Sequence, residues 1–433
     1  MKFLNFVSND GTSKNKTVYS WVLYDWANSA FAVCIFTVFY PLFFKSYWHP
    51  GVDATTSTFH LGLSNSLASI IIVFIAPIIG SIADNSSTKK WFLLFFAIMG
   101  ILMTAGLYFI HQGEWLIASG FYVMASIGFM GANIFYDSLL LIVADKNELD
   151  VISGLGYAFG YIGGGILFVF NIILVSNPEW FGLLDKTIAV RVSFISVAVW
   201  WLIFSIPIML YVAEPKTSKT GTVYQIIKSG LTELKNTFQE IKKFKIVVTF
   251  LVAYWLYIDG VDTIVRMSVD YGLSIGLDTN NLIIAIMITQ FIGFPAAIMF
   301  GFIGKKYGPK RGILIAITVY ILVTLYAVSM STTQEFYIMA IIIGLVQGGV
   351  QSLSRSLFAR IIPPSKSAEF FGFYNMMGKF AAVFGPLLVG GVAVITGNSR
   401  YSMLSLIILF VLGGILLYFV DEQKAINNIK EMS

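Results

Sequence analysis

The loop GSIADNSSTKK at residues 80–90 decides the fold, because it returns later in the chain as GFIGKKYGPKR at residues 301–311. Both copies begin with a glycine, carry a charged residue four positions later and end in a basic pair. Three further pairs recur at one constant and slightly shorter offset: Asp137 and Arg355, Gly154 and Gly372, and Gly160 and Gly378. Such a pattern indicates an internal duplication into two parallel halves.

The composition excludes a soluble domain. Of the 433 residues, 57% are hydrophobic and only 12% are charged, against roughly 25% charged in an average soluble domain. The single cysteine, Cys34, excludes a disulfide scaffold and a zinc site built from several thiolates. The three histidines, His49, His60 and His111, are expected to lie apart beside predicted loops, so we expect neither a metal site nor a cofactor.

The apolar residues come in blocks of about 20, the length of helix that crosses a bilayer. We therefore predict an all-α integral membrane protein in which twelve transmembrane helices form two pseudo-symmetric six-helix bundles. The predicted spans are residues 18–44, 59–83, 91–111, 115–144, 154–176, 188–213, 246–271, 279–304, 311–330, 335–361, 370–397 and 400–420.

Polar segments divide the chain into five predicted regions. They are a tail at 1–17, an N-terminal bundle at 18–213, a linker at 214–245, a C-terminal bundle at 246–421 and a tail at 422–433. Apolar residues in the linker recur at helical spacing with lysines opposite, which predicts an amphipathic helix on the membrane surface. They are Val223, Ile226, Ile227, Leu231, Leu234, Phe238 and Ile241.

The basic residues predict the orientation. Loops on the side of the two termini hold 21 of the 28 lysines and arginines, and the opposite side holds four. By the positive-inside rule both termini are cytoplasmic, and we expect a multi-pass protein of the cell inner (cytoplasmic) membrane. The acidic loop at Asp145, Glu148 and Asp150 does not change this, because acidic residues count little in the rule. The net charge of +5 then reflects orientation, and no nucleic-acid partner is expected.

The two loops resemble the major facilitator loop signature, Gly-x-x-x-Asp-(Arg/Lys)-x-Gly-x-(Arg/Lys)-(Arg/Lys). The first copy retains Gly80, Asp84, Lys89 and Lys90, and has Asn85 and Ser87 in the basic and glycine positions. The second copy retains Gly301, Lys306, Gly308, Lys310 and Arg311, and has Lys305 where the acid belongs. If the acid of this loop holds the two halves together by pairing with a helix end, the second copy cannot do so in the same way.

A narrower resemblance covers nearly the whole chain. It is carried by Tyr24-Asp25-Trp26-Ala27-Asn28-Ser29-Ala30, by Gly156-Tyr157 with Gly160-Tyr161, by the run from Gly348 to Ser356, and by Glu369 to Pro386. These motifs are similar to the "unknown major facilitator" group, bacterial relatives of the fungal autophagy-linked vacuole effluxers. The resemblance implies the major facilitator fold. It implies little about substrate, since amino-acid efflux and a lipid-related role are both attributed to relatives.

Seven charged residues fall inside predicted spans: Asp25, Asp137, Asp259, Asp262, Arg266, Arg355 and Lys379. A charge at that depth costs several kcal/mol, so each needs a partner or a role. Asp25, Asp137, Arg355 and Lys379 fall on one layer about 10 Å from the cytoplasmic ends of their helices. We expect the two acids of the first half to meet the two bases of the second, either as a gate that breaks during transport or as static pairs.

Helix 335–361 presents Gln347, Gln351 and Arg355 on one face. A polar stripe that ends in arginine suits a carboxylate or phosphate, because guanidinium offers a bidentate fork. The alternative is a glycine-rich packing face with a serine network.

Two further acidic positions are candidate substrate or proton sites. In helix 246–271, Asp262 and Arg266 are spaced for an intrahelical pair, which leaves Asp259 as a proton or amine site. In helix 18–44, Asp25 and Asn28 beside Tyr24 suit a cation, with interfacial aromatic anchoring as the alternative. Asp25, Asp137, Asp259, Asp262, Arg266 and Arg355 form the proposed gating and proton-coupling set.

Together these features predict a secondary transporter that works by alternating access, with protons as the candidate coupling ion. Opposite charges on opposite halves favour a small zwitterionic or anionic metabolite such as an amino acid. A lysophospholipid or another amphiphile is the alternative, because a phosphate headgroup fits Arg355 and Lys379 equally well. The spans carry no His/Ser/Asp set, so we expect no enzyme. Membrane lipids and the substrate are the expected partners of a monomer.

Overall fold

A computed structural model describes residues 12–214, 223–239, 244–274, 276–396 and 399–432. Within these ranges, eleven helices are long and apolar enough to cross a membrane, and α13 is a further helix at the place of the predicted span 370–397. The tail residues 1–11 and the linker residues 215–222 and 240–243, which include Ile241, lie outside the described residues.

Each predicted span corresponds to a long helix or to consecutive helical segments. The first span is α1 (Thr12–Ala30), a π-helical segment (Phe31–Phe39), α2 (Tyr40–Phe43) and a second π-helical segment (Phe44–Trp48). The rest of the N-terminal half, which we define as residues 12–214, consists of α3 (Ala54–Ser86), α4 (Lys89–Gly106), α5 (Trp115–Val143), α6 (Leu149–Ser176) and α7 (Lys186–Tyr211).

The C-terminal half, residues 244–432, repeats this arrangement after the linker helix α8 (Val223–Gln239). Its helices are α9 (Lys245–Ser274), α10 (Thr279–Tyr307), α11 (Pro309–Ala327), α12 (Thr333–Ile361), α13 (Ser367–Thr396), α14 (Ser399–Leu404), α15 (Leu406–Tyr418) and α16 (Glu422–Met432). The helix α16 occupies the region that the sequence predicted only as a tail.

Several helices begin earlier than the apolar blocks predicted. Helix α3 starts at Ala54, where Asp53 accepts a hydrogen bond from the amide of Thr56 and caps the first turn. Helix α6 starts at Leu149, so Asp150 belongs to a helix and not to the acidic loop that the sequence predicted. Hydropathy marks where a helix becomes apolar, whereas capping decides where it begins.

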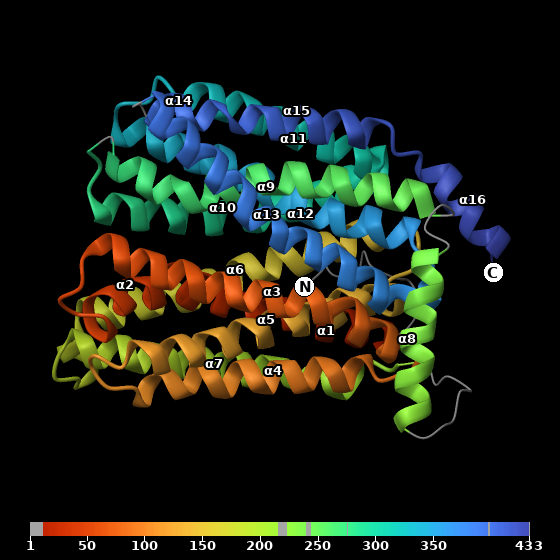
Figure 1. Ribbon diagram of the computed structural model, residues 1–433, viewed down its shortest axis with the longest axis horizontal. Coiled ribbons are helices and arrows are strands. Elements are labelled where there is room, and N and C mark those ends of the chain that lie inside the picture. Colours follow the sequence, from red (N-terminus) through yellow and green to blue (C-terminus); the bar gives the residue numbers. More distant parts are fainter. Residues whose placement is uncertain (1–11, 215–222, 240–243, 275, 397–398, 433) are drawn as a thin grey trace.

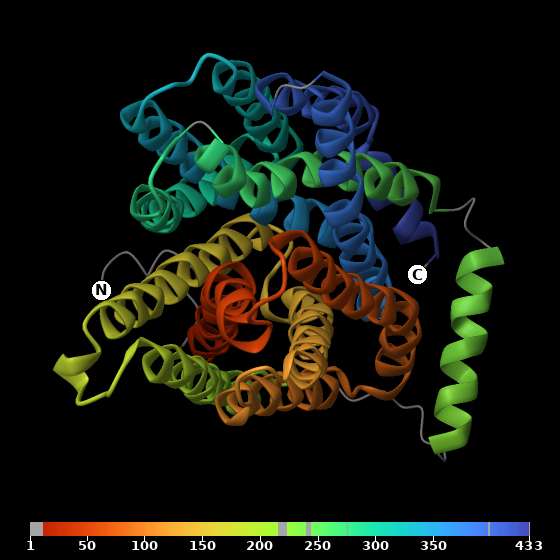
Figure 2. The same cartoon turned by 60° about the vertical axis from the view of Figure 1, so that its left-hand side comes forward.

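The two halves lie side by side with their helices roughly parallel, and α8 runs across one end of the N-terminal half as far as the edge of the C-terminal half (Figure 1). Seen from another direction, α8 stands at the edge of the bundles (Figure 2). On α8 the carbonyl of Gly230 accepts a hydrogen bond of 2.9 Å from the hydroxyl of Ser81 on α3. We call the end of the bundle that carries α8 the linker end, and the other the opposite end.

The halves meet at two crossings related by the internal repeat, α3 with α13 and α6 with α10. At the first, a Cβ on Gly372 would lie 2.8 Å from the carbonyl oxygen of Ala76. At the second, a Cβ on Gly154 would lie 2.8 Å from the carbonyl oxygen of Ala297. The two glycines, Gly154 and Gly372, are equivalent positions of the internal repeat, and so are the two alanines. The alanines are separated by the offset of the repeated loop, and the glycines by the slightly shorter offset.

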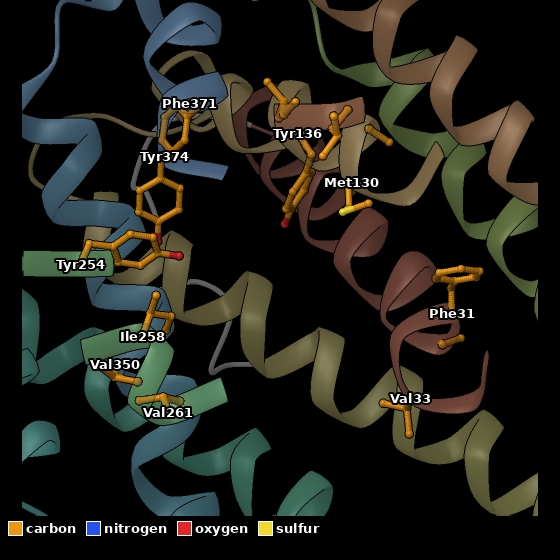
Figure 3. Close-up of a cluster of buried hydrophobic side chains, with 14 of the residues drawn as sticks. Phe31, Val33, Met130, Tyr136, Tyr254, Ile258, Val261, Val350, Phe371 and Tyr374 are labelled. Carbon is orange, nitrogen blue, oxygen red and sulfur yellow. The ribbon is translucent and has the colours of Figure 1, made fainter. Parts of the chain in front are cut away.

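Aromatic side chains lie among the buried hydrophobic residues of both halves, such as Tyr136 in one and Tyr254 and Tyr374 in the other (Figure 3). In the C-terminal half, Tyr254 of α9 stacks on Tyr374 of α13 with ring centroids 4.1 Å apart. In the N-terminal half, Trp21 of α1 stacks on Tyr136 of α5 at 4.4 Å. Stacked rings add to the apolar burial that holds neighbouring helices in register.

The glycines of α6 let α1 approach closely, as the spacing of Gly156, Gly160 and Gly164 predicts. A Cβ on Gly163 would lie 2.6 Å from the ring of Trp26 and 2.8 Å from its carbonyl oxygen. A Cβ on Gly165, two residues later, would lie 3.4 Å from its nearest neighbour, the Cβ of Gln290, which is an ordinary contact distance.

We predict that Gly163→Ala destabilises the protein by about 1–3 kcal/mol, the usual cost of overpacking a tight contact. The measurement is the melting temperature of the purified protein in detergent. The matched control is Gly165→Ala in the same helix, which should leave the melting temperature unchanged or slightly higher. Equal effects of the two substitutions would contradict the packing described.

Candidate functional site

The first copy of the loop motif fastens α3 to the start of α13. The carboxylate of Asp84 accepts hydrogen bonds from the amides of Ala368 (3.1 Å) and Glu369 (2.8 Å). Lys89 pairs with Asp84 at 2.8 Å and donates to the hydroxyl of Ser367 at 2.7 Å. A carboxylate at a helix N-terminus satisfies amides that the helix leaves free and meets the positive end of its dipole. We call this set the α3–α13 latch.

The other residues of the first copy shape this contact. A Cβ on Gly80 would lie 2.3 Å from the carbonyl oxygen of Ala368, so only glycine lets α3 reach α13. Lys90 donates to the carbonyls of Met209 (2.8 Å) and Val212 (2.5 Å), which end α7.

The second copy acts differently, as its missing acid led us to expect. Lys305, which stands in place of the acid, is exposed, and so is Arg311. Lys310 donates to the carbonyls of Tyr418 (2.6 Å) and Val420 (2.8 Å) at the end of α15, as Lys90 does for α7.

Asp150, on the first turn of α6, replaces the missing acid. It is fully buried and accepts hydrogen bonds from Ser356 (2.6 Å) and Arg360 (2.5 Å) of α12. Gly301 and Gly304 of α10 pass directly over it, since a Cβ at either would lie about 3.0 Å from Asp150 atoms. An acid beside the start of a helix therefore joins the halves twice: Asp84 of α3 binds the first amides of α13, and Asp150, in the first turn of α6, binds α12.

The second copy also retains the glycine that its turn requires. Gly308 has a φ of +89°, which suits glycine and ends α10. The equivalent position in the first copy is Ser87, whose φ is +50°. Both copies thus have a positive φ at this position, but the turns differ, because ψ is 143° at Gly308 and 46° at Ser87.

Arg355 of α12 crosses into the N-terminal half and meets two acids there. Its guanidinium lies 3.1 Å from Asp137 of α5 and 3.5 Å from Asp25 of α1. It also donates to the hydroxyl (3.0 Å) and the carbonyl (2.9 Å) of Ser153 on α6. Arg355 is only 2% exposed, so these bonds replace its water shell.

Aromatic rings enclose the same guanidinium. Its central carbon lies 4.3 Å from the ring centroid of Tyr157, 4.9 Å from that of Trp21 and 5.3 Å from that of Tyr136. Gly156 makes room, because a Cβ there would lie 2.8 Å from a guanidinium nitrogen. A planar cation between rings gains cation–π energy that an ammonium on a flexible stem matches poorly.

Both acids are held by further partners. Tyr136 donates to Asp25 at 3.0 Å, and Asn375 of α13 donates to Asp137 at 3.1 Å. We call Arg355, Asp25, Asp137 and Ser153 the arginine lock. It connects three helices of the N-terminal half to α12, and Asn375 adds α13. Because the hydrogen bonds of the guanidinium go to this chain, a substrate anion has no free guanidinium to bind in this conformation.

Lys379, the fourth residue expected in this layer, does not join the lock. Among the described residues it makes no ion pair, and its side chain is partly exposed. The intrahelical pair expected on α9 is also not formed: within the described part of the chain no ion pair joins Asp262 to Arg266. Arg266 is exposed and lies over the ring of Phe36 at 5.7 Å, so it reaches toward the other half instead.

Asp259 lies between α9 and α13 and is 1% exposed. One carboxyl oxygen accepts from the amide of Gly385 (2.9 Å) and from Thr263 (3.3 Å). The other oxygen is buried without a hydrogen-bond partner among the described residues. This is compatible with a proton-binding carboxyl, whereas a substrate has no direct access to it here.

The other residues predicted to bind substrate do not gather in one site. Asn28 is buried and donates to Asn133 of α5, and Tyr24 is buried against Tyr136 at 5.1 Å. They therefore do not form the cation site with Asp25 that the sequence suggested. On α12, Gln351 accepts from Tyr161 of α6 at 3.2 Å, and the side-chain oxygen of Gln347 is buried without a partner in the described ranges.

The histidines correct another expectation. His49 and His60 do not lie apart: their ring centroids are 5.1 Å apart, and His60 stacks on Trp115 at 4.3 Å. Burial lowers the pKa of His49. In the part of the chain that the structure describes, no group of three or more histidine, cysteine, aspartate or glutamate residues is placed to hold a metal ion.

The sequence identified the charged residues of the arginine lock, Arg355, Asp25 and Asp137, but not the aromatic and serine side chains that contact them. Trp21, Tyr136 and Tyr157 are aromatic residues in an aromatic-rich chain, and Ser153 is one serine among many. The one available signal was Asp150, an acid three residues before Ser153, because an acid at the start of an apolar block must find partners.

Comparison with known proteins identifies the family. The family described as "Vacuole effluxer Atg22 like" matches residues 50–430. The chain belongs to this family. It is also 40% identical over 409 residues to an uncharacterized MFS-type transporter of Bacillus subtilis, YxiO, with 94% of this chain and 95% of that protein covered. Autophagy-related protein 22 of Yarrowia lipolytica is 24% identical, over 86% of this chain and 77% of that protein.

Solved structures show the same fold. The proton:xylose symporter XylE has a TM-score of 0.73 at 13% identity and covers 97% of this chain and 99% of its own. The transporter FucP in its outward conformation has a TM-score of 0.69 at 13% identity, over 95% of this chain and 99% of that one. This member of the Atg22-like family is thus a multi-pass membrane transporter with the major facilitator fold.

The lock predicts a requirement for the guanidinium fork. Arg355→Lys keeps the charge but cannot reach Ser153 and both acids at once, and each lost charge-assisted bond costs about 1.5–3 kcal/mol. We expect a melting temperature lower by several degrees in detergent. Arg311→Lys, at an exposed arginine of the linker end, is the control and should melt like the native protein. A native melting temperature for Arg355→Lys would show that the fork contributes nothing.

Proposed function

We propose that this transporter moves a small zwitterionic metabolite, amino-acid-like in its charges, across the cell inner membrane by alternating access. Its linker end faces the cytoplasm and is closed in the conformation described. The basic loop residues of that end, Lys89, Lys90, Lys305 and Lys306, support this orientation through the positive-inside rule.

The closed state of the linker end is supported by the position of the polar bonds between the halves. The α3–α13 latch, the bonds of Asp150 and the arginine lock all lie toward that end. A transporter that exposes its substrate site to alternate sides must break one such set in each cycle. We infer that the lock and the latch are the cytoplasmic gate, and that Arg355 serves this gate and not the substrate in the outward-facing state.

The substrate class rests on one observation above all. Lys379 on α13 and Asp262 on α9 carry opposite charges, are partly exposed at the depth of the membrane and have no ion pair with any described residue. Charges exposed to lipid at that depth cost several kcal/mol, so they face a water-filled path. Lys379 suits a carboxylate or phosphate and Asp262 an ammonium group.

Arg266, exposed on the same helix as Asp262, and the amide of Gln347 extend this polar set. Arg266 lies on α9 with Asp262, and Gln347 lies on α12 with Arg355. The helix α12 therefore carries both a candidate substrate group and the arginine of the gate. We infer that substrate binding between α9 and α13 acts on the lock through α13, whose Asn375 donates to Asp137.

The experiment is a thermal-shift screen of amino acids, other zwitterions and lysophospholipids on the purified protein, followed by uptake of hits into liposomes. We expect zwitterions to stabilise the native protein, and Lys379→Gln and Asp262→Asn each to lower affinity at least tenfold, about 1.4 kcal/mol. Lys305→Gln, an exposed lysine outside this set, should bind and transport like the native protein.

Stabilisation by lysophospholipids alone would instead assign the amphiphile class. Full affinity for zwitterions in Lys379→Gln and Asp262→Asn would place the substrate elsewhere.

Proton coupling is a separate prediction on Asp259. Because one of its carboxyl oxygens is buried without a partner among the described residues, the neutral form of Asp259 costs less free energy to bury than the charged form. We expect uptake driven by a pH gradient in the native protein and gradient-independent exchange in Asp259→Asn. Counterflow of labelled substrate is the control, because it needs no gradient. Transport by the native protein that ignores the pH gradient would remove proton coupling from the proposal.

A further inference from the structure

Glu369, in the first turn of α13, is a buried acid for which neither the latch nor the transport pathway accounts. The residue is 0% exposed, and both of its carboxyl oxygens are buried without a hydrogen-bond partner among the described residues. Its backbone amide is engaged, since it donates to Asp84. The side chain therefore occupies the joint between the halves with no ion pair among the described residues, and only the hydroxyls of Ser81 and Thr237 lie beside it.

The charged groups around Glu369 are already committed to other partners. Lys89 pairs with Asp84 at 2.8 Å. Lys366, three residues before Glu369, pairs with Glu233 of α8 at 2.7 Å and donates to Thr237 at 3.0 Å. The nearest other acid, Asp84, repels a second negative charge at this place.

The hydroxyls beside the carboxyl group compensate for its burial only in part, because burial outweighs them and raises the pKa of Glu369. Ser81 and Thr237 flank it, but Ser81 gives its hydrogen to the carbonyl of Gly230 at 2.9 Å. The linker helix α8, through Thr237 and Gly230, thus covers the acid on the side away from α13. A carboxylate without partners in such a place costs several kcal/mol, whereas a protonated carboxyl costs far less.

We propose that Glu369 is a proton-binding site that is occupied while the linker end is closed and is emptied when it opens. Opening separates α3 and α8 from α13, water reaches the carboxyl group, and its proton passes to water on the linker side. Closing requires that a proton from that side binds again. This inference rests on the alternating-access proposal, but it does not depend on the substrate or on Asp259.

The sign of the pH effect follows from this cycle. Below the titration range of buried Glu369 the closed linker end has its full stability, and above it closure requires either an unpaired buried charge or uptake of a scarce proton. A rise in pH on the linker side therefore favours opening. For one proton fully coupled to closure, the open-to-closed ratio changes up to tenfold per pH unit, which corresponds to about 1.4 kcal/mol.

The test measures the distance across the linker end in the complete chain. Spin labels are placed on cysteines at Lys146 of the N-terminal half and Lys305 of the C-terminal half, both exposed, in a Cys34→Ser background that removes the single native cysteine. Distance distributions are recorded without substrate from mildly acidic to mildly alkaline pH. We expect the long-distance population to grow with pH in the native background.

Glu369→Gln, which is neutral at every pH, should remain at the short distance throughout. The matched control is Glu148→Gln, an acid of the same end that pairs with Lys14 at 2.9 Å; it should titrate like the native background. Glu369→Asp keeps an ionisable group, should retain the pH response and serves if the glutamine variant folds poorly.

An unchanged pH response in Glu369→Gln, or no pH response in the native background, overturns the proposal. Since no substrate is present, these outcomes are independent of whether the proposed substrate class is right. A protein that binds no zwitterion and still opens in a Glu369-dependent way would contradict only the proposed function.

Discussion

The structure depends on one buried guanidinium. Arg355 is a C-terminal-half residue whose bonds go to Asp25, Asp137 and Ser153 of the N-terminal half. Charges of this kind are costly to bury, and the cost is offset only when every partner is in place. The helices that supply those partners must therefore be positioned together. The close approach of α6, allowed by Gly156, and the stacking of Trp21 on Tyr136 both serve this arrangement.

Different residues hold the two halves together at the two repeat-related places. At the α3–α13 crossing Asp84 of α3 binds the N-terminal amides of α13, and beside the α6–α10 crossing Asp150 of α6 binds side chains of α12. The first arrangement uses backbone donors, which every substitution except one to proline retains, while the second uses a serine and an arginine. The internal duplication has thus kept the geometry and lost the chemical symmetry. The proton site proposed at Glu369 lies at the crossing with backbone donors.

The sequence predicted the fold and the main charges, but not their pairing. Hydropathy and the repeated loop were sufficient for the spans, because membrane thickness and the repeat leave few alternatives. They also placed Asp137 and Arg355 in one layer, where the structure joins them at 3.1 Å. The expected Asp262–Arg266 pair failed because spacing along a helix shows which side chains can meet, not which alternatives compete for them. Arg266 has an aromatic ring of the other half within reach.

The crossings at Gly372 and Gly154 have a consequence for how such transporters diversify. At both, a backbone carbonyl of Ala76 or Ala297 occupies the place of a side chain. At these two contacts the halves therefore meet through main chain, whose shape changes little when residues elsewhere are replaced. Residues that face the transport path can vary without disturbing these contacts. Main-chain contacts of this kind depend on small residues at a few positions only, so they allow a fold to persist while most side chains change; the xylose symporter shares the fold with a TM-score of 0.73 at 13% identity.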